Sequence, residues 1–191
     1  GDAELAADMV RDIEDMDAIL DQFLAFIRDG SDEPLEALDL AALIRETVTP
    51  YNQQDEKIRL CLEPLPELSL RRVSMKRLLV TLIDNALHYG GEGVEVTATV
   101  EGGRTAPYLV LSVLDRGPGL SLEELDVLFN PFIRGDSARG GKGSGLGLAI
   151  VRRIAALHGG SVELRNRAGG GLEARVCLPL GLLLPREATS S

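Results

Sequence analysis

The sequence has 191 residues, 45% hydrophobic and 26% charged, which predicts one globular domain with an appendage and no apolar run long enough to span a bilayer. The formal net charge of −10 lies entirely in residues 1–36, which hold twelve acidic and two basic residues, whereas the remainder holds eighteen of each. Because nucleic acid and anionic membrane surfaces both require a basic face, this charge distribution excludes them as partners.

Residues 3–28 are predicted to form one long helix. Its apolar residues recur in alternating steps of four and three, at positions 9, 13, 16, 20, 23 and 27, which is the seam of a coiled coil or helical bundle. A single helix cannot bury such a seam. We expect it to pair with a preceding helix that the sequence does not contain, with a second copy of the chain, or with both; packing on the chain's own domain is the alternative.

The elements that follow mix helices with alternating strands. After a hinge at 31–36, helices are expected over 38–48, with Asp39 as N-cap, and over 74–89, with Ser74 as N-cap. Strands are expected at 58–62 and 67–71, and two hairpins at 94–114 and 161–178. Because strands and helices do not alternate regularly, the predicted class is α+β, a two-layer sandwich of helices on a sheet, ending in a tail at 181–191.

A glycine-rich loop at 140–148 leads directly into an amphipathic helix. The N-terminus of a helix presents unpaired N–H groups and the positive end of the helix dipole, so such a loop favours phosphate binding. A plain linker before a core helix is the alternative. The loop is not a P-loop, because Gly143 stands where that motif requires Ser or Thr, and it does not fit the dinucleotide fingerprint.

Polar residues earlier in the chain suggest a ligand site. Asp84, Asn85 and His88 are expected to share one edge of their helix, where an amide oxygen suits Mg²⁺, although a helical asparagine is more often simply solvated. Asp115 follows an apolar strand, where its carboxylate can accept a hydrogen bond from an exocyclic amine. The glycines after it allow a flat ring to approach the backbone; a plain turn is the alternative.

The segment before the glycine-rich loop combines aromatic and basic residues. Arg134 and Arg139 suit a mobile lid that brings cations to phosphate oxygens. Phe129 and Phe132 are also expected to anchor this segment to the core.

Together, these four motifs resemble the ATP-binding domain of sensor histidine kinases, in the ATPase superfamily shared with gyrase, Hsp90 and MutL. Residues 82–89 resemble the N box, 115–119 the first glycine box, 129–132 the F box and 143–148 the second glycine box. The likeness covers residues 37–180 and is strongest to EnvZ-type osmosensors. It implies a Bergerat-type ATP-binding fold there, and it implies that residues 1–30 are the second helix of a dimerisation and phosphotransfer hairpin.

The resemblance also implies roles for single residues. Asn85 would ligate Mg²⁺ and, with Arg134 and Arg139, form the catalytic set. Asp115 would bond the amino group of adenine. The other expected ATP contacts are His88, Tyr89 against the base, Gly117 and Gly119 in the adenine pocket, and Gly143, Ser144, Gly145, Leu146 and Gly147 at the phosphates.

Two positions depart from the family pattern. Thr81 stands where the family often has a second asparagine, and His88 stands where a basic residue is usual.

His158 is expected at a helix C-terminus, as a cation that complements the dipole. Cys61 and Cys177 are expected to be reduced core residues.

The implied protein is a histidine kinase that transfers the γ-phosphoryl group of ATP·Mg²⁺ to a histidine on a helix absent from this sequence, and from there to an aspartate of a response regulator. We expect a homodimer joined through the N-terminal helix, forming the cytoplasmic portion of a bacterial inner-membrane sensor, with no membrane contact by the present chain. The alternative is a non-catalytic, ATP-gated assembly module. An ATP-hydrolysing machine is a third interpretation, and it would need a water-activating carboxylate such as Asp84.

Overall fold

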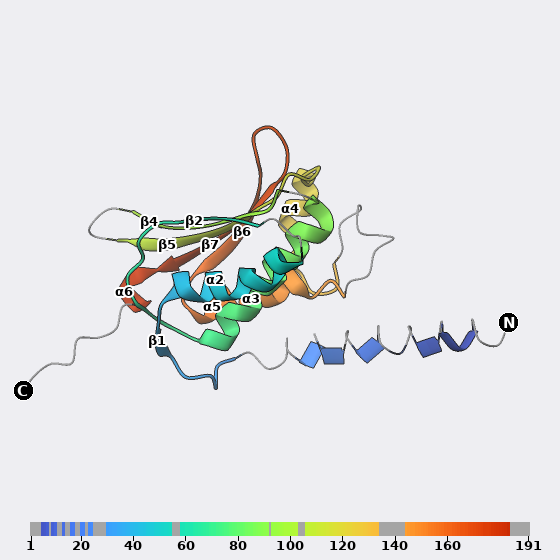
Figure 1. Cartoon of the computed structure of the whole chain (residues 1–191), viewed down its shortest axis with the longest axis horizontal. Coiled ribbons are helices and arrows are strands. Elements are labelled where there is room, and N and C mark those ends of the chain that lie inside the picture. Colours follow the sequence, from blue (N-terminus) through green and yellow to red (C-terminus); the bar gives the residue numbers. More distant parts are fainter. Residues whose placement is uncertain are drawn as a thin grey trace, which may run out of the picture.

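The computed structural model contains one central sheet, one small sheet and a layer of helices (Figure 1). The residues that it describes are isolated positions between 5 and 24 together with 30–54, 58–91, 93–102, 106–133 and 144–183.

The central sheet has five strands in the order β2-β4-β5-β7-β6. Strand β2 runs parallel to β4, and the other neighbours are antiparallel. The expected hairpins are both present. The strands are β2 (Arg59–Leu62), β4 (Glu95–Glu101), β5 (Tyr108–Leu114), β6 (Ser161–Asn166) and β7 (Leu172–Pro179).

Helices α2 (Leu40–Gln53), α3 (Arg72–Gly90) and α5 (Gly147–Leu157) cover one face of this sheet (Figure 1). Helix α3 contacts both of the others. The side chains between the two layers are fully or almost fully buried, including Ile44, Leu79, Ile83, Val96, Leu109, Leu111, Val151 and Val176. The prediction of a two-layer α+β sandwich is therefore confirmed.

Helix α2 has the predicted N-cap but ends later than predicted. The Asp39 carboxylate accepts a hydrogen bond from the Ala42 N–H at 2.9 Å, which confirms the N-cap. The helix continues through Pro50, which has no N–H to donate. Beyond that proline, the Tyr51 hydroxyl bonds Asp84 and the Asn52 side chain bonds the backbone of Ile58, so tertiary contacts carry the helix past the position expected from the sequence.

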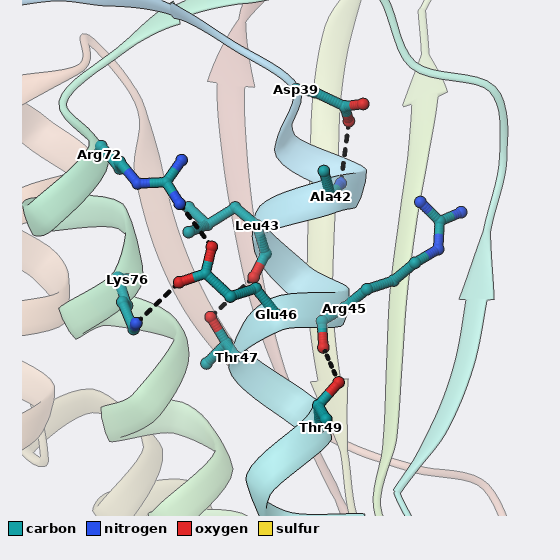
Figure 2. A network of polar contacts seen from close by, with 9 residues as sticks. All are labelled: Asp39, Ala42, Leu43, Arg45, Glu46, Thr47, Thr49, Arg72 and Lys76. Carbon is teal, nitrogen blue, oxygen red and sulfur yellow. Dashed lines mark hydrogen bonds and ion pairs between the residues drawn. The ribbon is translucent and has the colours of Figure 1, made fainter.

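An ion-pair bridge also joins α2 to α3 (Figure 2). The Glu46 carboxylate lies between Arg72 at 2.5 Å and Lys76 at 3.0 Å, and these two cations, Lys76 above all, lower the pKa of Glu46. All three side chains are exposed, so the bridge orients the two helices more than it stabilises them.

The expected cap of α3 at Ser74 is wrong. The helix starts at Arg72, and the first-turn N–H groups are satisfied by a residue distant in sequence. The Glu33 carboxylate accepts hydrogen bonds from the N–H of Val73, from the N–H of Ser74 at 3.0 Å and from the Ser74 hydroxyl at 2.6 Å. A carboxylate there also complements the positive end of the helix dipole.

The segment before α2 is not wholly a hinge leading into a helix. Strand β1 (Glu36–Leu38) pairs antiparallel with β3 (Leu68–Leu70), so Leu38 belongs to a two-stranded sheet and not to the following helix. At the other end of the chain, α6 (Leu180–Leu183) occupies the start of the expected tail, and Leu180 is buried.

The described positions between 5 and 24 are helical, as predicted, and their large apolar side chains are exposed, among them Met9, Ile13, Met16, Leu20 and Phe23. Phe23 also approaches the F-box residue Phe132, with ring centroids 6.5 Å apart. None of the described helices is both long enough and apolar enough to cross a membrane.

Cys61 and Cys177 are both free thiols, but Cys61 is exposed, so the expectation that it belongs to the core is wrong. Its strand β2 lies at the edge of the sheet.

Candidate functional site

The candidate site lies where the C-terminal half of α3, the end of β5 and the start of α5 meet. The half-buried Asn85 comes from α3, and the N-terminus of α5 lies against it. A Cβ atom added at Gly147 would lie 3.9 Å from Asn85 Nδ2 and only 3.1 Å from Thr81 Cγ2. The structure therefore brings the expected metal ligand to the expected phosphate loop, and the methyl group of Thr81 fills the space between the two helices.

Asp115 is the most buried acid of the site, with 6% of its surface exposed. Its Oδ1 atom accepts hydrogen bonds from the N–H groups of Gly117 at 2.9 Å and Leu172 at 3.0 Å. Within the described part of the chain, no hydrogen bond reaches Oδ2. One oxygen therefore fixes the carboxylate, and the other remains available to a ligand that can donate a hydrogen bond.

The glycines around Asp115 allow two backbone segments, the end of α3 and the loop that begins at Asp115, to approach each other. A Cβ atom at Gly90 would lie 2.2 Å from Asp115 Cβ, and one at Gly117 would lie 2.8 Å from both the Gly90 Cα and the Tyr89 carbonyl oxygen. Gly119 has a φ of 75°, which side chains rarely adopt. The contacts within the protein therefore require glycine at these positions, whether or not a ligand binds.

Residues at the end of α3 face solvent. His88 and Tyr89 are both exposed, and their rings meet edge to face with centroids 4.5 Å apart. Asp84 does not remain free beside Asn85, because it accepts a hydrogen bond from the Tyr51 hydroxyl at 2.7 Å. Burial and this carboxylate together raise the pKa of Tyr51, so the phenol stays protonated and keeps donating.

Among the residues that the structure describes, no side chain caps the N-terminus of α5, where the N-cap residue is Leu146. Leu146 is fully buried, and its N–H donates to the Ser144 hydroxyl at 3.2 Å, so this N–H already has a protein acceptor. Gly145 has a φ of 71°, and its carbonyl oxygen accepts a hydrogen bond from the Phe132 N–H at 3.0 Å. The uncapped first turn of an eleven-residue helix is suited to an anionic ligand.

The F box divides into a buried and an exposed half. Phe129 is 7% exposed and lies 6.0 Å from the Arg152 guanidinium, which the sequence did not single out. Phe132 is 60% exposed and has a φ of 65°, so its expected role as a core anchor is wrong. Arg134, Arg139 and Gly143 lie outside the described residues.

His158 ends α5 as expected but is not a cation. It is buried, its Nδ1 lies 2.8 Å from the Ile154 carbonyl oxygen, and its Nε2 accepts a hydrogen bond from the Arg71 N–H at 3.1 Å. Burial lowers its pKa, and the neutral ring is the form that fits both bonds. The expected interaction of a charged His158 with the helix dipole is therefore wrong.

Comparison with known proteins identifies the family. Residues 71–182, more than half of the chain, match the family described as "Histidine kinase-, DNA gyrase B-, and HSP90-like ATPase". The chain belongs to this family.

Two relatives come from Mycobacterium tuberculosis. The "Probable sensor histidine kinase HK" of strain CDC 1551 / Oshkosh is 34% identical over 167 residues, covering 86% of the present chain and 43% of its own length. The "Sensor histidine kinase component HK1" of strain H37Rv is 36% identical over 142 residues, covering 74% and 82%. The chain thus spans less than half of the first relative and most of the second.

Among solved structures, the histidine kinase domain of the E. coli osmosensor EnvZ is similar, with a TM-score of 0.61 and 35% identity over 84% of this chain and 95% of that one. The chain is the catalytic, ATP-binding part of a sensor histidine kinase, as the four motifs predicted. The resemblance to the EnvZ type is consistent with this structural likeness.

Proposed function

We propose that this histidine kinase domain binds ATP as its Mg²⁺ complex between α3 and the loop preceding α5, with Asp115 accepting a hydrogen bond from the adenine amino group. The observation that carries this proposal is the asymmetric use of the Asp115 carboxylate: Oδ1 is held by two backbone N–H groups, and Oδ2 has no described protein donor. A carboxylate oxygen that no described protein group binds, on a residue only 6% exposed, can accept a hydrogen bond from a ligand N–H.

Asn85 has the chemistry to hold a magnesium ion whose remaining ligands would be phosphate and water. Among the described residues, no group of three or more Asp, Glu, His or Cys side chains could hold a metal. Mg²⁺ is commonly bound through one or two oxygen ligands together with phosphates and water, and the Asn85 amide oxygen would supply the protein ligand. When bound, the ion would neutralise charge on the phosphate oxygens. On this proposal the uncapped N-terminus of α5 and the cations of Arg134 and Arg139 bind the same phosphates.

We further propose that the γ-phosphoryl group passes to a histidine on a helix that this sequence does not contain. Neither histidine of the chain suits the role of acceptor. His158 is buried with both ring nitrogens engaged, and on this proposal His88 would contact the nucleotide itself. Phosphoryl transfer depends mainly on positioning and on charge neutralisation, so the domain itself would orient ATP and exclude water.

The partners follow from this chemistry. The phosphoryl group would pass to an aspartate of a cognate response regulator, and the exposed apolar side chains between Met9 and Phe23 would pair in a homodimer. The domain would then form the cytoplasmic portion of a bacterial inner-membrane sensor.

The second candidate is an ATP-gated assembly module without transfer. The contact of Phe23 with Phe132 favours it, because it links the N-terminal helix directly to the segment that precedes the phosphate loop. Thr81 and His88, the two departures from the family pattern, also favour it.

A transfer assay separates these functions. The chain is mixed with γ-labelled ATP, Mg²⁺ and a helical hairpin peptide that carries an acceptor histidine. We expect acid-labile label on the peptide. Release of free phosphate would instead indicate a hydrolase, and nucleotide binding with neither product would indicate the assembly module. No binding of ATP by the folded chain would refute the proposal as a whole.

A further inference from the structure

The turn between β6 and β7 holds the loop that carries Asp115. We call residues 115–120 the Asp115 loop. The Asp115 N–H donates to the Leu172 carbonyl oxygen at 2.9 Å, and the Leu172 N–H donates back to Asp115 Oδ1 at 3.0 Å. The Arg167 guanidinium donates to the Asp115 carbonyl oxygen. The first residue of the loop is therefore tied to the β6–β7 turn through backbone and side chain.

The last residue of the Asp115 loop is tied to the same hairpin by one side chain. Asn166, at the end of β6, accepts a hydrogen bond from the Leu120 N–H at 2.9 Å and donates one to the Leu120 carbonyl oxygen at 2.7 Å. The carboxamide thus pairs with both backbone groups of one residue, as a neighbouring strand would.

Gly119 lets Asn166 approach this closely. A Cβ atom at Gly119 would lie 2.6 Å from Asn166 Oδ1, a distance that no real side chain could keep. The glycine therefore serves two purposes at once: it adopts the positive φ of the loop, and it leaves space for the Asn166 amide.

Stability alone does not account for the Asn166 contacts. Asn166 and the bonds that it makes are exposed, so water can satisfy the Leu120 N–H and carbonyl oxygen when the amide is removed. The fold should survive that loss. What water cannot replace is the fixed position of Leu120 relative to β6, because a water molecule is not attached to the strand.

We propose that Asn166 is a positioning residue for recognition of the nucleotide base. It fixes one end of the Asp115 loop while Arg167 and Leu172 fix the other. The free oxygen of Asp115 and the backbone of the loop then meet a purine ring in one preset geometry. This inference rests on the proposed function, since it assigns base selectivity to the same site.

The test compares Asn166→Ala and Asn166→Asp with Arg165→Ala as the control. Arg165 is the preceding residue on β6, is exposed, and pairs with Glu163, away from the Asp115 loop. Calorimetry measures the affinity of each full chain for ATP·Mg²⁺, GTP·Mg²⁺ and inorganic tripolyphosphate with Mg²⁺, and amide hydrogen exchange by NMR measures protection of the Leu120 N–H without nucleotide.

For Asn166→Ala we expect about tenfold weaker ATP binding, the scale of the entropy lost when one loop residue must be ordered on binding, together with a smaller preference for ATP over GTP. Tripolyphosphate affinity and the melting temperature should stay at the parent values, and the Leu120 N–H should exchange faster. Asn166→Asp should act in the same direction, because its carboxylate keeps the acceptor but cannot donate to the Leu120 carbonyl oxygen. Arg165→Ala should leave every readout unchanged.

Two results would overturn the inference: unchanged ATP affinity and base preference in Asn166→Ala, or an equal loss for ATP and tripolyphosphate, which would indicate a general structural effect. Failure of the parent chain itself to bind ATP·Mg²⁺ would refute the proposed function and the inference with it. The parent measurement therefore distinguishes the two failures.

Discussion

The sharpest test of the nucleotide site is Asp115→Asn. The substitution keeps the shape of the side chain, and the amide oxygen can take the place of Oδ1, which accepts from the N–H groups of Gly117 and Leu172. The amide nitrogen must then occupy the position of Oδ2. There it presents a donor to the adenine amino group, which is also a donor, so the proposed hydrogen bond is lost.

The size of the effect follows from the charge of the lost acceptor. A hydrogen bond to a charged group contributes about 1.5–3 kcal/mol, so ATP affinity should fall by about 10- to 150-fold. Inosine triphosphate has a carbonyl oxygen where ATP has the amino group, and this oxygen can accept from the new amide. Its affinity should therefore fall less than that of ATP, or rise.

Isothermal titration calorimetry with a non-hydrolysable ATP analogue and Mg²⁺ measures both affinities. Asp39→Asn is the matched control, because it makes the same chemical change at the N-cap of α2, where asparagine also caps well. If Asp115→Asn is folded and binds ATP and inosine triphosphate as the parent does, Asp115 does not read the base and the assignment of the site is wrong.

Three further predictions concern the helices that frame the site. Burial lowers the pKa of His158 below its usual 6.5, so the unfolded chain takes up the proton first and the free energy of unfolding should fall as the pH drops below about 6.5. Urea unfolding at pH 7.5 and 5.5 should show this loss in the parent and a smaller one in His158→Gln. Glu33→Gln should lower the free energy of unfolding by about 1 kcal/mol, less at high salt, because it removes a charged cap; an unchanged urea midpoint would contradict this. Gly147→Ala should lower the melting temperature by crowding Thr81, and adding Thr81→Ser, which removes the crowded methyl group, should restore it; failure of this rescue would place the strain elsewhere.

Local sequence patterns predicted most of the fold. The helical spacing in α3 and α5, the alternation in the strands of both hairpins, and Asp39 as a cap all depend on residues a few positions apart. The order of the four motifs likewise predicted that Asn85 and the start of α5 belong to one site, and the structure brings Gly147 beside Asn85. These features can be predicted because the residues that determine each of them lie within one helical turn or one strand.

The expectations that failed depend on partners far away in the sequence. Ser74 looks like a cap, but the helix starts two residues earlier, and Glu33 from another segment accepts hydrogen bonds from the N–H groups of Val73 and Ser74. His158 looks like a surface cation until packing buries it against the Arg71 N–H. Asn166 lies in an ordinary strand end, and only the tertiary fold brings it to Leu120. Arg134 and Arg139, outside the described residues, stay predictions.

The hydrogen bonds of Glu33 to the first turn of α3 also determine where the chain can be truncated. The segment that matches the ATPase family begins at residue 71, beside the first turn of α3. It includes neither α2 nor Glu33, which accepts hydrogen bonds from that turn. A truncation at that boundary would remove the helix that packs against α3, and it would remove the acceptor of the first N–H groups of α3. We therefore expect the smallest autonomous unit to be larger than residues 71–182, and excision for biophysical work should begin upstream of Glu33.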